Sequence, residues 1–315
     1  MRRHILSSSL LLLLVFSPLI GRAEQPALTG TISLSGAWAI YPLAVKWGEA
    51  FRKLHPHVRM DISAGGAGKG MTDVLTGVVD IGMVSREVDP AEKAKGALPI
   101  YIAKDAVFAT VNTRNPAIGI IQQEGMTLKT LTDIFINGKI GTWKQAVGGP
   151  ERPLHIYMRS DSCGAASAWA GTLGKYTQAD LKGIGVYGDP GLLQAVQRDP
   201  LGIGFNNLGF IFNGRSLVKG IALVPIDANK NGKVDPNERI DSRDKAYKEI
   251  AAGRYPGTRR EYFVTKGAPS GLALAFIKYT MSDAGMKVLN QVGGYVAPSA
   301  AERKAQLKKM GLAMK

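Results

Sequence analysis

The feature that most constrains the fold of this 315-residue chain is a repeated order of apolar run, small-residue turn and amphipathic helical pattern. The run GTISLSG (30–36) is followed by the helical pattern YPLAVKWGEAFRKLHP (41–56), and VRMDISA (58–64) is followed by GKGMTDVLTGV (68–78). This order is typical of parallel α/β units. Two further strands are expected at VDIGMVS (79–85) and AVFATVN (106–112).

A second α/β set follows the polar, proline-containing stretch NTRNPAIG (112–119), which we interpret as the crossing between two lobes. We predict an α/β protein with lobe 1 formed by residues 24–113 plus 221–315 and lobe 2 by residues 114–220. A ligand cleft is expected between the lobes, near the carboxyl ends of the strands. The second set comprises an expected helix at 127–138, a strand at 154–158, a helix at 164–176, a turn and strand at 202–208 and two helices within 270–293.

The N-terminus has the composition of a secretory signal peptide. A basic start, MRRH, precedes an apolar run at 5–20, and GRA (21–23) has the small-x-Ala form of a cleavage site. A membrane anchor is the alternative, but the run is short for a spanning helix and contains Pro18. We predict a signal peptide at 1–23, cleavage after Ala23, and a monomeric periplasmic protein.

The charge balance indicates which partners to expect. The formal charge is +15 at pH 7, or +12 without the three arginines of the first 23 residues. This balance favours anionic partners. No run of basic residues is interleaved with aromatic residues, so we expect no nucleic acid partner. The chain has one cysteine, Cys163, which we expect to be a free thiol because it has no internal partner.

Three strand-to-helix turns place small residues where a helix begins: LSGAWAIYP (34–42), SAGGAGKGM (63–71) and MRSDSCGAASAW (158–169). Free N–H groups at such helix starts can converge on one negative ligand. Small residues at a single turn often serve packing alone, but three turns, with Arg159 and Asp161 in the third, favour an anion site. The second turn does not fit a P-loop, because serine stands at the first glycine position and glycine follows the lysine.

In this order and spacing, the three turns resemble those of the phosphate-binding substrate-binding proteins of ABC transporters. The resemblance rests on TISLSGAWAIYPLAVKWGEAF, ISAGGAGKGMTDVLTGVVDIGMVSRE and RSDSCGAA, with IGFNNLGF and YFVTKG also fitting, and it covers nearly all of residues 29–297. It implies a two-lobed type II periplasmic-binding-protein fold that closes like a hinge around a small oxyanion, without covalent chemistry, and an ABC permease as partner. The ligand-binding candidates are Gly36, Ala37, Trp38, Gly66, Ala67, Gly68, Ser85, Arg159, Asp161, Cys163, Gly164 and Ala165.

The chain departs from the family pattern in all three turns. The family's first turn usually reads Gly-Ser-x-Thr, whereas residues 36–39 read Gly-Ala-Trp-Ala. Its second turn usually reads Gly-Gly-Ser-Gly, with Ala67 at the serine here, and its third usually ends Ser-Gly-Thr, where residues 163–165 read Cys-Gly-Ala. Each lost neutral hydrogen bond typically costs about 0.5–1.5 kcal/mol. The departures therefore bear on which anion is bound.

Four side chains have two interpretations each. Asp161 could accept the proton of a partly protonated oxyanion or cap the helix expected at 164–175, and we favour capping. Arg159 could bind the ligand through two hydrogen bonds or pair with Asp161, and we favour the ligand. Trp38 could form a wall of the cleft or turn into the core. Cys163 should have a lowered pKa at a helix N-terminus near Arg159, which suits a soft ligand, but we favour a small core residue.

The segment DANKNGKVDPNE (227–238) matches a twelve-residue calcium-binding loop at every position. A strand is expected before it, at 221–226, so it is not part of a helix–loop–helix pair. The alternative is a surface turn rich in Asn and Asp. We expect one structural Ca²⁺, which stabilises an insertion in lobe 1, and no organic cofactor. The expected ligands are Asp227, Asn229, Asn231, the carbonyl of Lys233, Asp235 and the bidentate carboxylate of Glu238.

The sequence offers poor candidates for catalysis. It contains no nucleophile elbow, no zinc-protease motif and no cysteine cluster. Cys163 with His155 as nucleophile and base is unsupported, because both lie on one strand–turn segment. We expect no enzyme, and the leading hypothesis is an exported binding protein that captures phosphate or a phosphate-like oxyanion for an ABC importer. The alternatives are a diverged relative that binds a soft oxyanion through Cys163, and a sensor or surface scaffold without a transport role.

Overall fold

The structure is a computed structural model that describes residues 27–310. The predicted signal peptide at 1–23 lies outside the described residues. Within 27–310, no helix combines the length and apolar character needed to cross a membrane. The strands are β1 (Gly30–Gly36), β2 (Val58–Ala64), β3 (Ile81–Val84), β4 (Ala97–Asn112), β5 (Met126–Thr127), β6 (His155–Arg159), β7 (Ile184–Val186), β8 (Gly202–Asn207), β9 (Phe212–Asn213), β10 (Ser216–Leu217), β11 (Ile221–Leu223), β12 (Ile226–Asp227) and β13 (Thr258–Lys266).

Helices alternate with these strands, as the sequence predicts for an α/β protein. The short helices η1, a π-helix, and η2 and η3, which are 3₁₀, add to the α-helices. In chain order the helices are α1 (Tyr41–Leu54), α2 (Ala67–Thr76), α3 (Pro90–Ala94), α4 (Ile118–Glu124), α5 (Leu128–Thr132), η1 (Asp133–Asn137), α6 (Trp143–Val147), α7 (Gly164–Leu173), η2 (Gln178–Asp180), α8 (Gly188–Arg198), α9 (Leu208–Ile211), η3 (Pro236–Glu238), α10 (Arg243–Ala251), α11 (Gly271–Met281), α12 (Asp283–Val292) and α13 (Ala300–Lys309).

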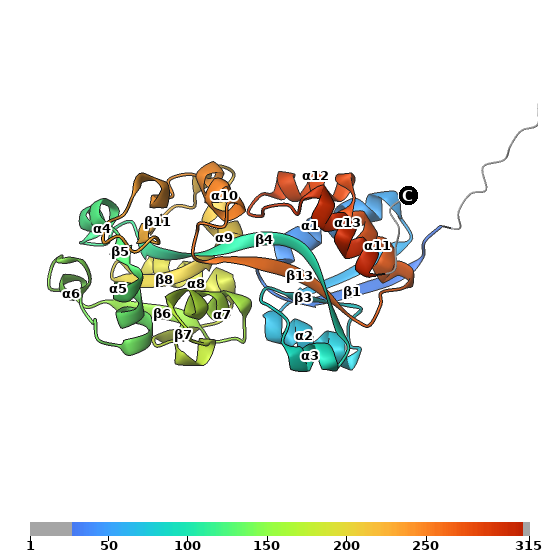
Figure 1. The fold of residues 1–315 in the computed structure, drawn as a ribbon, viewed down its shortest axis with the longest axis horizontal. Helices are drawn as coiled ribbons and strands as arrows, with labels where there is room; N and C mark the ends of the chain where they lie inside the picture. The colour runs from blue at the N-terminus through green and yellow to red at the C-terminus, as the bar shows by residue number, and fades with distance from the viewer. Residues whose placement is uncertain (1–26, 311–315) are drawn as a thin grey trace, which may run out of the picture.

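The molecule has two lobes, and the long strands β4 and β13 run between them (Figure 1). The main sheet has the order β2-β1-β3-β13-β4-β8-β6-β7, with β11 beside β4. The first lobe pairs β1 in parallel with β2 and β3, and the second pairs β6 in parallel with β7 and β8. The predicted two-lobed α/β class is therefore confirmed.

Each lobe has its own aromatic core. In the first lobe, α1 turns Trp47 and Phe51 inward, one helical turn apart, and the Trp47 ring meets Phe263 of β13 edge-on at 5.8 Å between centroids. In the second lobe, Trp169 of α7 stacks on Phe205 of β8, with the rings 18° from parallel. Because each core closes within one lobe, the lobes are separate packing units joined through the sheet.

We predicted that residues 112–119 form the crossing between the lobes. The structure shows instead that two antiparallel strands, β4 and β13, form it. β4 is a single strand of 16 residues that is buried along nearly its whole length, and β13 pairs with it from Thr258 to Lys266. The pairing register shifts between Glu261 and Tyr262, and such a bulge bends a strand locally. Residues 112–119 already belong to the second lobe, where Ala117 is part of the core.

The predicted lobe boundary at residue 221 also needs correction. β11 extends the second-lobe part of the sheet, because Ile221 pairs with Asn112, and β12 pairs in parallel with β5. Ile226 lies in the second-lobe core. Residues 221–257 therefore pack with the second lobe, and the segment expected to bind calcium belongs there. The short apolar runs around 221–227 predict strands, but the sequence does not indicate with which strands they pair.

Candidate functional site

The three glycine-containing turns lie in contact at the junction of the two lobes. The amide of Gly68, in α2, donates a hydrogen bond of 3.2 Å to the carbonyl of Ser162 in the third turn. A Cβ atom on Gly66 would lie 2.5 Å from that carbonyl oxygen and 2.9 Å from the Asp161 carboxylate. Glycine at residue 66, where φ is +94°, therefore permits the close approach of the second and third turns.

Ser85 brings the end of β3 to the third turn. Its side chain is buried, and a Cβ atom on Gly164 would collide with the carbonyl and hydroxyl oxygens of Ser85. The first lobe thus contacts the start of α7 through both Ser85 and the second turn. The sequence predicts that these residues meet, and the structure brings them together, while their role in binding an anion stays a prediction.

Several of the backbone N–H groups expected to be free are already paired. Ala37 donates to the carbonyl of Met83 at 2.8 Å, and Gly66 donates to the carbonyl of Gly36 at 3.0 Å. The amides of Ala67, Gly164 and Ala165 lie in the first turns of α2 and α7, where a helix provides no acceptor. These first-turn amides are of the kind that binds an anion at a helix N-terminus.

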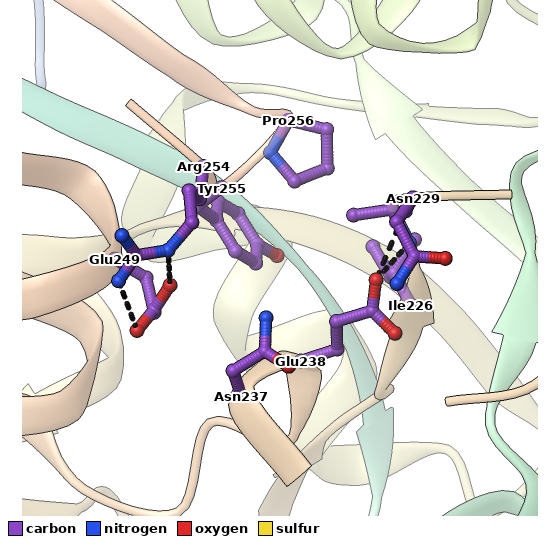
Figure 2. Close-up of a pocket in the computed structure, with 9 residues that line it drawn as sticks. Ile226, Asn229, Asn237, Glu238, Glu249, Arg254, Tyr255 and Pro256 are labelled. Carbon is purple, nitrogen blue, oxygen red and sulfur yellow. Dashed lines mark hydrogen bonds and ion pairs between the residues drawn. The ribbon is translucent and has the colours of Figure 1, made fainter. Parts of the chain in front are cut away.

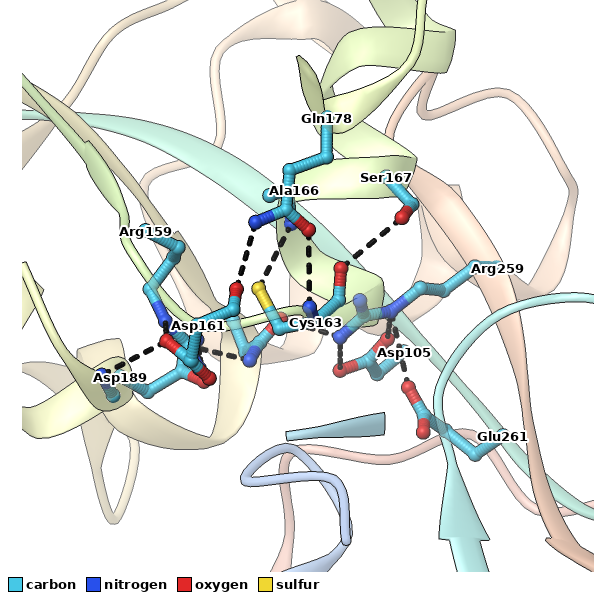
Figure 3. Close-up of polar contacts among 12 residues, drawn as sticks. Asp105, Arg159, Asp161, Cys163, Ala166, Ser167, Gln178, Asp189, Arg259 and Glu261 are labelled. Carbon is cyan, nitrogen blue, oxygen red and sulfur yellow. Dashed lines mark hydrogen bonds and ion pairs between the residues drawn. The ribbon is translucent and has the colours of Figure 1, made fainter. Parts of the chain in front are cut away.

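Arg159 forms a buried ion cluster with two carboxylates (Figure 3). Its Nε and Nη2 donate to the two oxygens of Asp161, and its Nη1 donates to Asp189. Arg159 is 1% exposed. The structure shows that Arg159 pairs with Asp161, whereas its role in binding the ligand, the interpretation we favoured, stays a prediction. Three of the five guanidinium N–H groups are engaged in this way, so two remain for another acceptor.

Asp189, which we did not predict from the sequence, is a member of this cluster. It lies in the first turn of α8, 30 residues after Arg159. In the sequence it looks like an ordinary acidic residue near the start of a helix, so nothing marks it as a partner of Arg159. Burial raises the pKa of Asp189, while Arg159 and Arg259 lower it. Burial also opposes the charged form of Arg159, but Asp189 and Asp161 raise its pKa above the ordinary arginine value. The guanidinium therefore stays a cation.

The cluster continues to the strands that join the lobes. Asp189 accepts a hydrogen bond of 2.6 Å from the amide group of Asn207, whose oxygen accepts one from Arg259 of β13. Arg259 donates to both oxygens of Asp105 of β4, at 2.7 and 3.1 Å, and lies 3.1 Å from Glu261. Burial raises the pKa of Glu261 well above its ordinary value. The third turn is thus linked to β4 and β13 by a continuous chain of buried polar contacts.

Asp161 does not cap α7, contrary to our preferred interpretation. Its carboxylate is held by Arg159 and by the amide of Gly188, which donates to it at 3.1 Å. The residue at the cap position is Cys163, whose Sγ accepts a hydrogen bond of 3.4 Å from the amide of Ala166. The arginine outcompetes the helix start for this carboxylate because a charged donor bonds more strongly than a neutral one.

The predicted low pKa of Cys163 is wrong. The thiol is buried, and burial raises its pKa to about 12; the nearby Arg159 lowers the pKa, but Asp161 and Asp189 raise it further. The rule that a helix N-terminus and a cation favour a thiolate assumes access to solvent, which this side chain lacks. Cys163 is a neutral thiol in the core of the second lobe, as the favoured interpretation has it.

Trp38 and His155 also have defined surroundings. The Trp38 ring lies at the boundary between the lobes and contacts Tyr41 and Tyr187 edge-on. Nδ1 of His155 lies 2.6 Å from the carboxylate of Asp199. The ring of His155 is therefore hydrogen-bonded to a carboxylate of its own lobe, and the structure shows no hydrogen bond between His155 and Cys163 within residues 27–310.

The segment 227–238 folds as a loop closed by its own side chains. Asp227 accepts from the amides of Asn231 and Gly232, at 3.1 and 2.9 Å, and Glu238 accepts from three amides at the two ends of the loop. Asp235 accepts from the side-chain amides of Asn229 and Asn231. Within 27–310, no group of three His, Cys, Asp or Glu side chains lies close enough to hold a metal ion. The predicted calcium site stays a prediction.

A cavity of about 160 Å³ adjoins this loop (Figure 2). Glu238 lies on one side of it, and the ion pair of Glu249 with Arg254 lies on another, with N–O distances of 2.7 and 2.9 Å. Its carboxylates are all engaged, by Arg254 or by backbone amides. The carboxylates that line the cavity are therefore not free to bind a ligand, and none of the three turns contributes to its lining.

The fold and the junction of the three turns define a class, the two-lobed α/β binding proteins whose lobes are joined by crossing strands. Residues 21–284 match the family model of the PBP superfamily domain, and the chain belongs to this family.

Relatives and solved structures agree with this assignment. The chain is 27% identical to the phosphate-binding protein PstS of Bacillus subtilis over 282 residues, which are 87% of this chain and 83% of that protein. It is 26% identical to PstS of Pseudomonas aeruginosa over 92% of this chain and 90% of that protein. The fold is similar to a phosphate ABC transporter substrate-binding protein of Clostridium perfringens with bound phosphate, with a TM-score of 0.71 at 22% identity, covering 86% of this chain and all of that one.

The neutral state of Cys163 leads to a measurable prediction. In the folded protein at pH 8, the thiol should react with a disulfide reagent on the order of 1,000-fold more slowly than in the urea-unfolded protein, because a pKa near 12 leaves little thiolate. The release of the reagent's chromophore with time gives both rates. Comparable rates in the folded and unfolded protein would show that the thiol is accessible and ionised.

Proposed function

We propose that this protein is an exported solute-binding protein that captures phosphate or a phosphate-like oxyanion for an ABC importer. The observation that carries the proposal is the meeting of three small-residue turns between two lobes, with the first turns of α2 and α7 at the same junction. Helix N-termini bind anions through their free amides. Relatives named as phosphate-binding proteins, matched over most of their length, support phosphate as the anion.

Lobe movement would admit the anion. The second and third turns touch through the Gly68–Ser162 hydrogen bond, so an oxyanion enters when the lobes part and this contact opens. The bulge in β13 at Glu261 offers a place for the crossing strands to bend. A bound anion then stabilises the closed arrangement by accepting hydrogen bonds from amides of both lobes. In the closed form the protein presents a surface to the permease that is present only when the solute is bound.

The chemistry proposed is binding without catalysis. Cys163 is held as a neutral thiol, and the His155 ring is engaged by Asp199. The same facts weigh against the alternative in which a soft oxyanion binds through Cys163, since a buried thiol is a poor ligand. The relatives are binding proteins by name, which also disfavours a sensor or scaffold without a small ligand.

Export and partners complete the proposal. The segment 1–23 has the composition of a signal peptide, and delivery to a periplasm-like space would place the mature protein beside an inner-membrane permease. A charge of +12 on the mature chain would increase the local concentration of anions around the protein. We propose a monomer that has no nucleic acid partner.

Calorimetry with purified mature protein tests the proposed ligand. Phosphate should bind at a single site with a dissociation constant in the micromolar range or below, about −8 kcal/mol or stronger. Sulfate, arsenate, molybdate and arsenite serve as comparisons, and arsenite tests the soft-ligand alternative. Cys163→Ser should leave phosphate affinity within about two-fold, because the side chain caps a helix and faces the core. An absence of heat at millimolar phosphate would contradict the proposal.

We also propose that the loop 227–238 binds one Ca²⁺ that stabilises the second lobe. The residue pattern supports this, as does the burial of Asp227 and Glu238, residues that are 2% and 7% exposed. Ca²⁺ would replace amide hydrogen bonds that now hold these oxygens. Extracellular calcium at millimolar levels suffices for even a weak site of this kind.

Thermal unfolding tests the calcium loop. With Ca²⁺ at about 100 times its dissociation constant, the midpoint should rise by roughly 5–10 °C over that in chelator, from about 2.7 kcal/mol of linkage. Glu238→Gln should lose most of this rise, whereas Asp241→Asn, just outside the loop and well exposed, should keep it. The same midpoint in calcium and in chelator would rule out the site.

A further inference from the structure

The indole of Trp38 lies across the boundary between the two lobes. Trp38 follows β1 in the first lobe, whereas Tyr187 and Gly188 begin α8 in the second. The Trp38 ring meets Tyr187 edge-on, with centroids 6.1 Å apart and an interplanar angle of 89°. A Cβ atom on Gly188, where φ is +73°, would lie 3.2 Å from the ring. Glycine at 188 therefore lets the indole approach the start of α8 closely.

The indole N–H of Trp38 is buried and has no hydrogen-bond acceptor among residues 27–310. A buried donor without a partner is unfavourable, so it requires an explanation. Trp169 has the same deficit, but its ring is fully buried against Phe205 in the second-lobe core. A missing acceptor alone therefore does not identify a ligand site. The residues around the donor determine whether a ligand could reach it.

The surroundings of the Trp38 N–H are those of the anion site. Nε1 lies 3.5 Å from the Cβ position of Gly188, and the Gly188 amide donates to Asp161. Asp161 is held by Arg159 and lies against Gly66 of the second turn. The N–H edge of the indole thus lies near Gly188, beside the Asp161 carboxylate that adjoins the second and third turns. These turns carry alanines at positions where the resemblance leads one to expect hydroxyls.

We propose that Trp38 determines the anion affinity of this site: its indole N–H donates to the bound oxyanion, and its ring closes the cleft against Gly188 and Tyr187. The inference rests on the proposed function and names a donor that compensates for a missing hydroxyl. An indole N–H donates and does not accept, whereas a hydroxyl does both. The oxygen that meets Trp38 must therefore accept a hydrogen bond, and the indole cannot receive the proton of a protonated oxygen.

The test removes the N–H and keeps an aromatic ring. Trp38→Phe and the matched control Trp169→Phe each delete an indole N–H that lacks an acceptor, one at the lobe boundary and one in the core. Calorimetry with phosphate, sulfate, arsenate and molybdate should show W38F weaker by about 10-fold or more for the anion that the wild type binds best, and W169F within about two-fold. Thermal unfolding of both variants verifies that they fold.

A second measurement needs no variant at residue 38. Tryptophan emission should change on adding the same anion, and by the same amount in wild type and W169F, because Trp38 is the tryptophan at the lobe boundary while Trp47, Trp143 and Trp169 are buried in the cores. Equal affinities of W38F and wild type, or no emission change on binding, would overturn the inference alone. A wild type that binds none of the four anions would overturn the proposed function together with it.

Discussion

The buried pairing of Arg159 with Asp161 and Asp189 is the interaction on which the arrangement of the site depends. It fixes the third turn against the start of α8, and through Asn207 and Arg259 it connects that turn to the strands that join the lobes. Removing one partner would leave a charge buried without compensation, at a typical cost of about 3–5 kcal/mol. The cluster therefore acts as a rigid frame, and the turns of the first lobe meet this frame through Gly66 and Ser85.

This frame changes how the site attracts an anion. Arg159 faces two carboxylates, so its charge is largely neutralised before any ligand arrives. Under the proposed function, the attraction would come from the first-turn amides of α7 and α2, the two remaining guanidinium N–H groups and the indole N–H of Trp38. Donors of this kind suit an oxyanion that presents unprotonated oxygens. The chain belongs to the family, and we propose that the indole N–H of Trp38 takes the place of one of the missing hydroxyls.

Much of the fold and part of the site follow from local sequence patterns. The turns at 34–42, 63–71 and 158–169 were predictable because glycine and small residues mark a close backbone approach within a few residues. Asp189 was not, since its partner lies 30 residues away and only the packing of α8 on β6 brings them together. The pKa of Cys163 was predicted with the wrong sign because a local rule about helix ends ignored burial, which needs the whole core. The crossing strands β4 and β13 pair across more than 150 residues, which no local pattern reveals.

In the proposed binding mode, the anion lies between the lobes, among the three turns, and Arg159 stays in its ion cluster. A crystal structure of the mature protein with phosphate tests this most directly. We expect phosphate density within hydrogen-bond distance of the amides of Gly164 and Ala165, with Asp161 still bonded to Arg159. Phosphate bound outside the junction of the turns, or an Arg159 that leaves both carboxylates to reach it, would show that this binding mode is wrong.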